Sequence, residues 1–406
     1  MTLSRGILVA TALALAGVGP AADASVHTGS STGEVRSVEV AAGDSGGSDP
    51  DAVERAPRLR VRTAVRRVDI PWDLTFLPSG AMLFTERDRE RIWWRGPEGR
   101  RRVVAATPRG VWHSGETGLM SILAARSFAR TRHFFTCHGV TRSNGHAIRV
   151  VRWRLNGRAT HARRVETIVP HLPTRSGRHG GCRLRFGAGG ALYIGTGDAA
   201  VGSNPQNLRS GGGKVLRVRP RTGAGWPSNP FADADHPMKR RIYTYGHRNV
   251  QGLALRADGR MWSVEHGTYR DDEVNRLRKG GNYGWNPVPG YDETTPMTDF
   301  SLPGRQIGAR WRSGDPTIAT SGATWLRGQR WGRWEGCLAV ATLADESLRI
   351  MRFRANGDFV RMWRPAALNG EYGRLRSVVL GPGNALYVTT ANGGGRDRIL
   401  RVAPRA

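Results

Sequence analysis

A short unit that recurs six times along the chain most constrains what this sequence can fold into. Each copy has a small polar turn with Gly or Asn, an alternating hydrophobic strand, polar residues and often a second strand, as in "LPSGAMLFTERDRERIWW" and "GPGNALYVTTANGGGRDRILRV". Alternation with a period of two residues between turn glycines predicts β-strands. The copies start near residues 77, 129, 186, 256, 333 and 381, and the second copy is the weakest.

Six such units, about 50 to 75 residues apart, predict an all-β fold. The fold that suits them is a six-bladed β-propeller, in which each unit forms one four-stranded antiparallel blade and radial closure leaves only short, protected edges. A pair of β-sandwiches would also give many short strands, but without such regular recurrence. In a propeller the loops at one end of the central channel converge, so residues distant in sequence can form one pocket.

The N-terminal 24 residues have the pattern of a secretory signal peptide. Arg5 is followed by an apolar run over residues 7–18 and by small residues that end at Ala24. A membrane anchor is the alternative, but this run is shorter than the ~20 apolar residues that span a bilayer, and no later segment is long and apolar enough. Residues 25–58, rich in Gly, Ser, Asp and Ala, predict a disordered leader. The propeller is therefore expected over residues 59–406, in a secreted or extracytoplasmic protein.

The formal net charge of +29 raises the question of nucleic-acid binding, because clustered cations neutralise phosphates. Only three of the 62 basic residues are lysines, and the arginines are spread through nearly every segment instead of along one stripe. This distribution is typical of an arginine-biased coding composition. We therefore expect no nucleic-acid partner, although the charge favours anionic surfaces outside the cell.

The three cysteines, Cys137, Cys182 and Cys337, are too few for a disulfide framework. In an oxidising compartment one pair could form a bridge and leave one thiol, but the spacing does not say which pair. There is no CxxC or Cys/His metal pattern. The simplest interpretation is that all three are small buried side chains.

Three loop segments contain candidate functional residues. "RSGRHGGCRLRF" places His179 between glycines just before a strand, although a lone loop histidine is often only a solvated residue. "SVEHGTYRDDEVNRLRKGGNYGW" contains four acidic residues and a Gly/Asn turn, which suit calcium, although a solvated acidic loop is the alternative. "GRLRSVVL" places Arg374 and Arg376 two residues apart, and hence on one face of a strand.

Six segments, taken in order, resemble the soluble quinoprotein sugar dehydrogenases of the glucose/sorbosone dehydrogenase family. They are "PWDLTFLPSGAMLFTER", "GETGLMSILA", "HGGCRLRFGAGGALYIGTGD", "YGHRNVQGLAL", "EHGTYRDDEVNRLRKGGNYGW" and "PTIATSGATWL". The resemblance covers about residues 66–404, and "GHRN" with "DEVN...GGNYGW" is its most specific part. It implies a six-bladed propeller that holds pyrroloquinoline quinone (PQQ) and calcium, oxidises the C1 hydroxyl of an aldose to a lactone and passes electrons to an external acceptor.

The resemblance also implies roles for individual residues. His179 matches the catalytic base, nineteen residues before Asp198 of "TGD". The positions that match cofactor-binding residues are Glu116, Arg248, Asn249, Arg374 and Arg376. Because PQQ carries three carboxylates, it calls for guanidinium groups that pair with carboxylates bidentately.

The resemblance places two calcium ions. The carbonyls of Gly267 and Thr268 fall where the family ligates a catalytic calcium, and Glu273 and Tyr283 match ligands of a structural one. In the family, the catalytic calcium polarises the quinone carbonyl as a Lewis acid.

Three positions depart from the family pattern. Glu116 stands in place of a glutamine, Thr268 in place of a proline and Ala344 in place of a cofactor lysine. An anionic Glu116 would sit badly beside a polyanionic cofactor unless it were protonated or turned toward a cation. Glu116 and Ala344 favour one alternative, a propeller that has lost its cofactor and binds carbohydrate or protein outside the cell. A propeller hydrolase or lactonase is a further alternative, but it does not explain the arginines at 248, 374 and 376 together.

Overall fold

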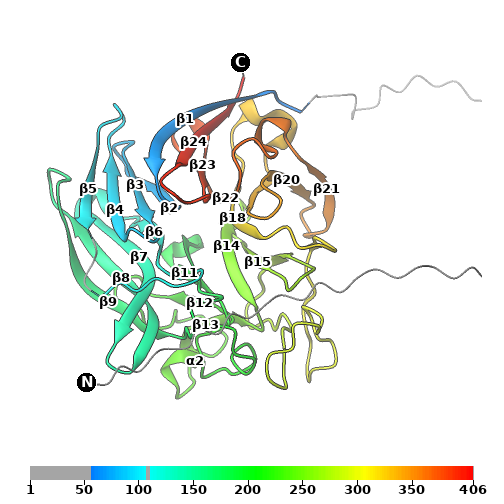
Figure 1. Ribbon diagram of the computed structural model, residues 1–406. Coiled ribbons are helices and arrows are strands. Elements are labelled where there is room, and N and C mark those ends of the chain that lie inside the picture. The colour runs from blue at the N-terminus through cyan, green and yellow to red at the C-terminus, as the bar shows by residue number, and fades with distance from the viewer. Residues whose placement is uncertain (1–55, 107–109, 406) are drawn as a thin grey trace, which may run out of the picture. The chain divides into compact units, whose positions relative to one another are not determined.

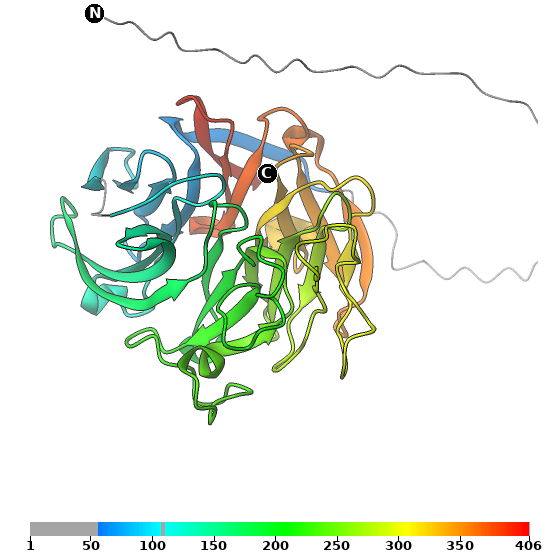
Figure 2. The ribbon, with the colours of Figure 1, turned by 60° about the horizontal axis from the view of Figure 1, so that its bottom comes forward.

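The computed structural model describes residues 56–106 and 110–405, which form six four-stranded antiparallel sheets around a central axis (Figures 1 and 2). This arrangement confirms the predicted six-bladed propeller and excludes the pair of sandwiches. The proposed signal peptide and most of the proposed leader, residues 1–55, lie outside the described residues. The first strand begins at Leu59.

Five of the sheets each use four consecutive strands. The first sheet contains β2 (Pro71–Phe76), β3 (Met82–Glu86), β4 (Arg91–Arg95) and β5 (Arg101–Ala106). The second contains β6 (Leu119–Ala124), β7 (His133–Arg142), β8 (Gly145–Leu155) and β9 (Ala162–Leu172). The third contains β10 (Gly181–Phe186), β11 (Leu192–Thr196), β12 (Lys214–Val218) and β13 (Ile242–Tyr245). The other two are β14 (Asn249–Leu255), β15 (Met261–His266), β16 (Glu273–Arg276) and β17 (Trp311–Arg312); and β18 (Thr320–Trp325), β19 (Leu338–Thr342), β20 (Leu348–Phe353) and β21 (Phe359–Trp363).

Helices are few and short in the described residues. The two α-helices are α1 (Phe128–Thr131) and α2 (Pro237–Arg241). Four 3₁₀ turns span Ala188–Gly190, Gln329–Trp334, Ala366–Leu368 and Pro382–Asn384. None of the helices in the described ranges has the length and apolar composition needed to cross a membrane.

The sixth sheet joins the two ends of the described chain. Its order is β1 (Leu59–Val68), β24 (Asp397–Pro404), β23 (Leu386–Thr390) and β22 (Leu375–Leu380). The register of β1 against β24 runs antiparallel, from Leu59 opposite Pro404 to Val68 opposite Asp397. Pairing the first strand with the last closes the ring and covers a strand edge that would otherwise invite association with another chain.

The innermost strands β2, β6, β10, β14, β18 and β22 contact one another in a ring around the axis. Each of them pairs with its outer neighbour through a register irregularity. Such bulges re-aim side chains, and Gln251 and Arg376 stand at two of them. The prediction that Arg374 and Arg376 share one face of a strand is therefore wrong. Arg374 precedes β22, and the bulge between Leu375 and Ser377 interrupts the simple alternation.

The hydrophobic core consists of six clusters, and each cluster lies between two neighbouring sheets. Because every sheet is covered on both faces, middle strands such as β11 (LYIGT) and β19 (LAVAT) are buried along their whole length. Such strands are expected to be apolar without a polar face. The blades therefore cohere mainly through apolar contact between sheets.

The cysteines differ from their simplest interpretation. Cys137 of β7 and Cys182 of β10 form a disulfide, with Cα atoms 5.6 Å apart, while Cys337 is a free, buried thiol. The bridge joins two neighbouring sheets and closes a loop of 45 residues. In the chain-entropy description, a loop of this length stabilises the fold by about 4 kcal/mol.

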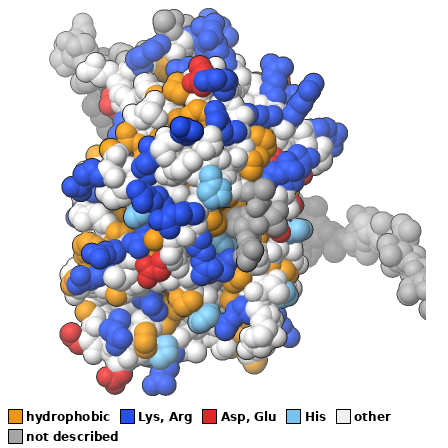
Figure 3. All heavy atoms as spheres, turned by 90° about the vertical axis from the view of Figure 1, so that its left-hand side faces the viewer, with side chains coloured by type: hydrophobic (Ala, Val, Ile, Leu, Met, Phe, Trp, Pro, Cys, Tyr) orange, Lys and Arg blue, Asp and Glu red, His pale blue; other side chains and the backbone are white. Residues whose placement is uncertain are grey.

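Figure 3 shows the left-hand side of the view in Figure 1, where β4, β5, β8 and β9 lie. Arginine and lysine side chains are scattered across this face among apolar and neutral groups, and acidic side chains are few. The cations are thus not gathered into one stripe on this face.

Candidate active site

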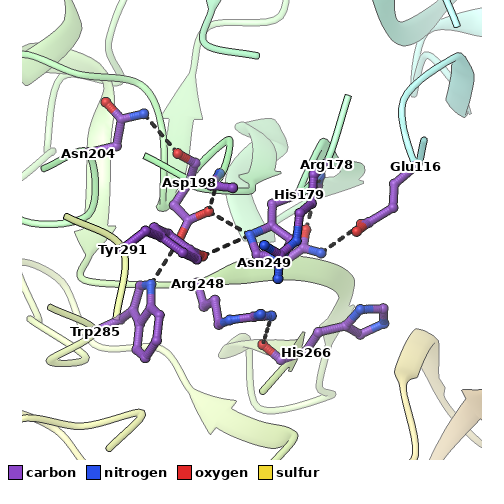
Figure 4. A network of polar contacts seen from close by, with 12 residues as sticks. Glu116, Arg178, His179, Asp198, Asn204, Arg248, Asn249, His266, Trp285 and Tyr291 are labelled. Carbon is purple, nitrogen blue, oxygen red and sulfur yellow. Dashed lines mark hydrogen bonds and ion pairs between the residues drawn. The ribbon is translucent and has the colours of Figure 1, made fainter. Parts of the chain in front are cut away.

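Loops that precede three neighbouring inner strands bring the candidate residues together (Figure 4). Glu116 lies shortly before β6, His179 before β10, and Arg248 directly before β14. The inner strands surround the axis, so these short loops place side chains from distant parts of the sequence at one end of the channel. The convergence expected of a propeller is confirmed for these three residues.

The backbone at His179 depends on glycine nearby. His179 has a left-handed φ of 54°, a conformation that costs a non-glycine residue energy and persists only where the surroundings hold it. Gly197, at the end of the neighbouring strand, allows this loop to approach, because a Cβ at position 197 would lie 1.8 Å from the carbonyl oxygen of His179. The glycines of these two segments thus bring His179 close to Asp198.

The imidazole of His179 is held by a buried carboxylate. Nδ1 of His179 lies 2.8 Å from Oδ1 of Asp198, and the two side chains are 3% and 0% exposed. Oδ2 of Asp198 accepts hydrogen bonds from Nε1 of Trp285 and from the hydroxyl of Tyr291, each at 2.8 Å. This arrangement directs the Nδ1 proton toward Asp198 and leaves Nε2 as the proton acceptor.

Tyr291 belongs to the long loop between β16 and β17, and the sequence did not single it out. Its hydroxyl oxygen lies 2.9 Å from Nδ1 of His179. Burial and the charge of Asp198 raise the pKa of this hydroxyl, so it remains neutral and can donate to the carboxylate. The loop has no strand alternation and no recognisable spacing, so no local pattern could have identified Tyr291.

Arg248 is almost fully buried and has three different environments for its nitrogens. Its Nη1 donates to the carbonyl of His266 at 3.4 Å, and its Nη2 forms an ion pair with Glu293. Its Nε has no hydrogen-bond partner among the described residues. Its backbone N–H donates to Glu265 at 2.9 Å, which fixes the start of β14.

Asn249 and Glu116 contact each other directly. Nδ2 of Asn249 donates to Oε2 of Glu116 at 2.8 Å, and Nε2 of Gln251 donates to the same oxygen at 3.2 Å. Burial opposes ionisation of Glu116, but the charges of His179 and His266 and the bond from Asn249 outweigh burial and lower its pKa. Glu116 is therefore an ionised carboxylate held by two amides.

The two predicted arginines of the last blade have different positions. Arg376 is buried, and its Nη1 donates to Oε1 of Gln251 at 3.1 Å, which joins it to the cluster around Asn249. Burial, together with the nearby charges of Arg87 and Arg374, lowers the pKa of Arg376 to about 9. Arg374 itself is exposed, and its backbone N–H donates to Oδ1 of Asn392 at 2.9 Å. It acts on this cluster through its charge, which lowers the pKa of Arg376.

The expected catalytic calcium ligands lie beside the same cluster. Gly267 and Thr268 directly follow β15, whose last residue, His266, accepts the bond from Arg248. The N–H of Gly267 donates to Oδ1 of Asp272 at 2.9 Å. Asp272 therefore fixes the backbone that carries these two carbonyls.

The expected structural calcium ligands, Glu273 and Tyr283, both lie near Glu265. Oε1 of Glu273 is buried, has no hydrogen bond from the part of the chain that the structure describes, and lies 3.4 Å from Nε of Arg312. Burial, together with the charge of Glu265, raises the pKa of Glu273 to about 8. The hydroxyl of Tyr283 donates to the carbonyl of Arg276 at 2.7 Å, so a cation could use only its main-chain oxygen. No group of three or more His, Cys, Asp or Glu side chains in the described ranges has a metal-binding arrangement.

Comparison with known proteins gives a consistent result. The family model described as glucose/sorbosone dehydrogenase matches residues 68–401. The aldose sugar dehydrogenase YliI of Escherichia coli K12 is 30% identical over 357 residues, which cover 86% of this chain and 93% of that protein.

Two solved structures have the same fold over nearly the same range. The PQQ-bound aldose sugar dehydrogenase of Streptomyces coelicolor is 29% identical with a TM-score of 0.71, and the match covers 86% of this chain and 100% of that one. The soluble aldose sugar dehydrogenase of Escherichia coli is 26% identical with a TM-score of 0.74, over 86% and 100% of the two chains. With its fold, its site and these matches taken together, the chain belongs to the glucose/sorbosone dehydrogenase family.

Proposed function

We propose that this protein is an extracytoplasmic, PQQ- and calcium-dependent dehydrogenase that oxidises the C1 hydroxyl of an aldose to the lactone and passes the electrons to an external acceptor. One observation carries the proposal. His179, held by the buried Asp198, lies in the same cluster as two buried arginines, Arg248 and Arg376, that have unused N–H groups. The PQQ-bound relative from Streptomyces coelicolor supports the choice of cofactor.

The donors of this cluster fit a ligand with several carboxylates. Nε of Arg248 and Nε of Arg376 are buried and have no hydrogen-bond partner among the described residues. A buried polar group without a partner costs about 1–3 kcal/mol, which a ligand carboxylate would relieve at the arginines. When bound, PQQ supplies a quinone that accepts the hydride from C1 of the sugar.

Two sets of oxygen atoms, one directly after β15 and one in and after β16, would suit calcium. The carbonyls of Gly267 and Thr268 would hold the catalytic ion, and the unbonded Oε1 of Glu273, with the main-chain oxygen of Tyr283, would hold the structural one. The second set is supported by the burial of Glu273 opposite Glu265, because a cation there would stabilise two buried carboxylates. When bound, the catalytic ion would polarise the quinone carbonyl as a Lewis acid.

The chain's own residues would move the proton. Nε2 of His179 would take the C1 hydroxyl proton as hydride leaves the same carbon, so the sugar loses two electrons and becomes the lactone. Asp198 would stabilise the resulting imidazolium, and Trp285 and Tyr291 hold that carboxylate in place. A base of this kind typically contributes about 10²–10⁴-fold to the rate.

A second candidate function is a propeller without cofactor that binds carbohydrate or protein outside the cell. One observation favours it: Glu116 is ionised and takes the amide of Asn249 that would otherwise contact the cofactor. The alanine at position 344 points the same way, because a cofactor lysine is expected there.

The two functions are separated by one reconstitution. The purified protein is loaded with calcium and PQQ, and dye reduction is followed with a panel of aldoses. We expect sugar-dependent turnover that falls at least 100-fold in His179→Ala while PQQ uptake persists, and no change in His161→Ala, which removes an exposed histidine. Equal activity in His179→Ala would remove His179 from the mechanism. No PQQ uptake together with measurable glycan binding would establish the binding protein instead.

A further inference from the structure

Glu293 connects two arginines at the edge of the candidate site. It lies in the loop between β16 and β17, and its side chain is 34% exposed. Its Oε1 pairs with Nη2 of Arg248 and lies 2.6 Å from Nη2 of Arg178, which is also 2.7 Å from Oε2. Figure 4 shows Arg178 and Arg248 close to His179. No feature of the sequence indicated a role for Glu293.

The contact between Glu293 and Arg248 limits how a ligand carboxylate can bind this guanidinium. A guanidinium can bind a carboxylate bidentately through Nε and Nη2 or through Nη1 and Nη2. Both pairs include Nη2, which carries two N–H groups, and Glu293 takes one of them. Glu293 therefore blocks one of the two bidentate contacts and neutralises the guanidinium charge that would attract a ligand carboxylate.

We infer that Glu293 is an internal competitor for Arg248, and that it sets how tightly the protein binds a cofactor with carboxylate groups. This inference rests on the proposed function, because it concerns the PQQ site. It adds a residue outside the family motifs to the groups that determine cofactor affinity.

Arg178 makes the exchange feasible. It contacts both oxygens of Glu293, so the carboxylate keeps a charged partner when it releases Arg248. Arg178 is 45% exposed, which gives the pair room to move toward solvent. The hydrogen bonds from Arg178 and Arg248 also lower the pKa of Glu293 against the effect of burial, so the competitor is charged at neutral pH.

The neighbouring Asp292 provides a matched control. It is exposed, and it accepts hydrogen bonds from the N–H and the hydroxyl of Thr294 within the loop. Glu293→Gln and Asp292→Asn each remove one carboxylate charge from adjacent positions with almost no change in shape. Only the first removes the partner of Arg248, so a general charge effect would appear in both variants.

The test is a titration of each protein with PQQ in excess calcium, followed by quenching of tryptophan fluorescence. Trp285 lies under Arg248, with its ring centre 5.7 Å from Cζ, and can report on binding. We expect Glu293→Gln to bind PQQ about five- to tenfold more tightly than the wild type, and Asp292→Asn to stay within about twofold. Glu293→Asp keeps the charge on a shorter side chain, so its affinity for PQQ is expected to lie between those of the wild type and Glu293→Gln.

The possible outcomes separate the inference from the proposed function. Tighter binding in Glu293→Gln alone supports the competition, as does binding in that variant when the wild type does not bind. Wild-type binding that is unchanged or weakened in Glu293→Gln overturns the competition and leaves the proposed function intact. If no variant binds PQQ, both are overturned.

Discussion

Two polar clusters lie at the axis of the propeller. The carboxylate of one comes from a strand, and those of the other come from loops. The axial network consists of Asp73 with Ser121, Arg183, Arg185 and Ser377, and all of these residues belong to inner strands of four sheets. The site cluster around His179 uses carboxylates from loops, namely Glu116, Asp198 and Glu293. Both clusters contain guanidinium N–H groups without a hydrogen-bond partner among the described residues, so this feature does not distinguish the two clusters.

The axial network fixes its carboxylate completely. Asp73 is fully buried, and its oxygens lie 2.9 Å from Nη1 of Arg183 and 3.2 Å from Nη1 of Arg185. They also accept hydrogen bonds from Ser121 at 2.5 Å and from Ser377 at 2.9 Å. Burial opposes ionisation, but the two arginines and Ser121 outweigh it and lower the pKa of Asp73 to about 2. This carboxylate ties four sheets together and cannot be exchanged for a ligand.

The site cluster is anchored less firmly. Glu116 and Glu293 are only partly buried, and each occupies a donor that the proposed cofactor would use, Asn249 and Arg248 respectively. Loops on a rigid scaffold can change conformation without unfolding the sheets. The comparison indicates that the strand-borne charge of Asp73 holds the fold, whereas the loop-borne charges of Glu116 and Glu293 can be given up to a ligand.

The largest expected effect is on stability, at the axial network. Asp73→Asn leaves the buried Arg183 and the partly buried Arg185 without a carboxylate, which typically costs about 3–5 kcal/mol. Urea unfolding measures the loss of free energy. Asp88→Asn, which removes the partner of Arg87 near the surface, is expected to cost less than about 1 kcal/mol. An equal loss in the two variants would contradict the structural role of the axial network.

The corresponding change in the site cluster is expected to affect binding and not folding. Arg248→Gln should weaken PQQ binding roughly thirtyfold, or about 2 kcal/mol, because a charged hydrogen-bonding group is lost. The free energy of unfolding should change by less than about 1 kcal/mol, since the partner of Arg248 is partly exposed. Arg260→Gln, at an exposed arginine, is the control for both measurements. A large loss of stability in Arg248→Gln would remove the distinction between the clusters.

Acid pH provides a smaller test of the axial network. The pKa of Asp73 lies below its ordinary value of 3.8, at about 2, so its contribution to stability is present above about pH 4 and is lost as the pH falls toward 2. The full contribution is about 2 kcal/mol, and about half of it is lost by pH 3. Between pH 5 and pH 3, the wild type should therefore lose about 1 kcal/mol more than Asp73→Asn. Parallel pH dependence of urea unfolding in the two proteins would show that Asp73 is not held in its charged form.

The smallest expected effect concerns the loop that carries Tyr291. Tyr291→Phe removes one hydrogen bond to Asp198 and should lower kcat about three- to fivefold, with the KM for sugar and the affinity for PQQ within about twofold. Such a split is expected of a positioning residue, because the contacts to the ligands remain. Tyr269→Phe, which alters an exposed tyrosine, should leave kcat unchanged. A rise in KM with unchanged kcat would assign Tyr291 to substrate binding instead.

The sequence by itself determined the architecture and pointed to several residues of the candidate site. Strand alternation and turn glycines are local properties, so six recurring units were enough to predict six four-stranded blades. The motifs around His179, Arg248 and Asn249 also identified loops that meet at one end of the channel. This succeeded because a propeller places equivalent loops together once the repeat is known.

The tertiary structure alone decided which distant groups became partners. The disulfide between Cys137 and Cys182, the pairing of Asp73 with Arg183 and the contact of Glu293 with Arg248 all join different blades or loops. The bulge in β22, which separates Arg376 from Arg374, likewise depends on how that strand pairs with its neighbour. None of these features leaves a local pattern in the chain, because each results from the packing of sheets and from loops without periodic structure.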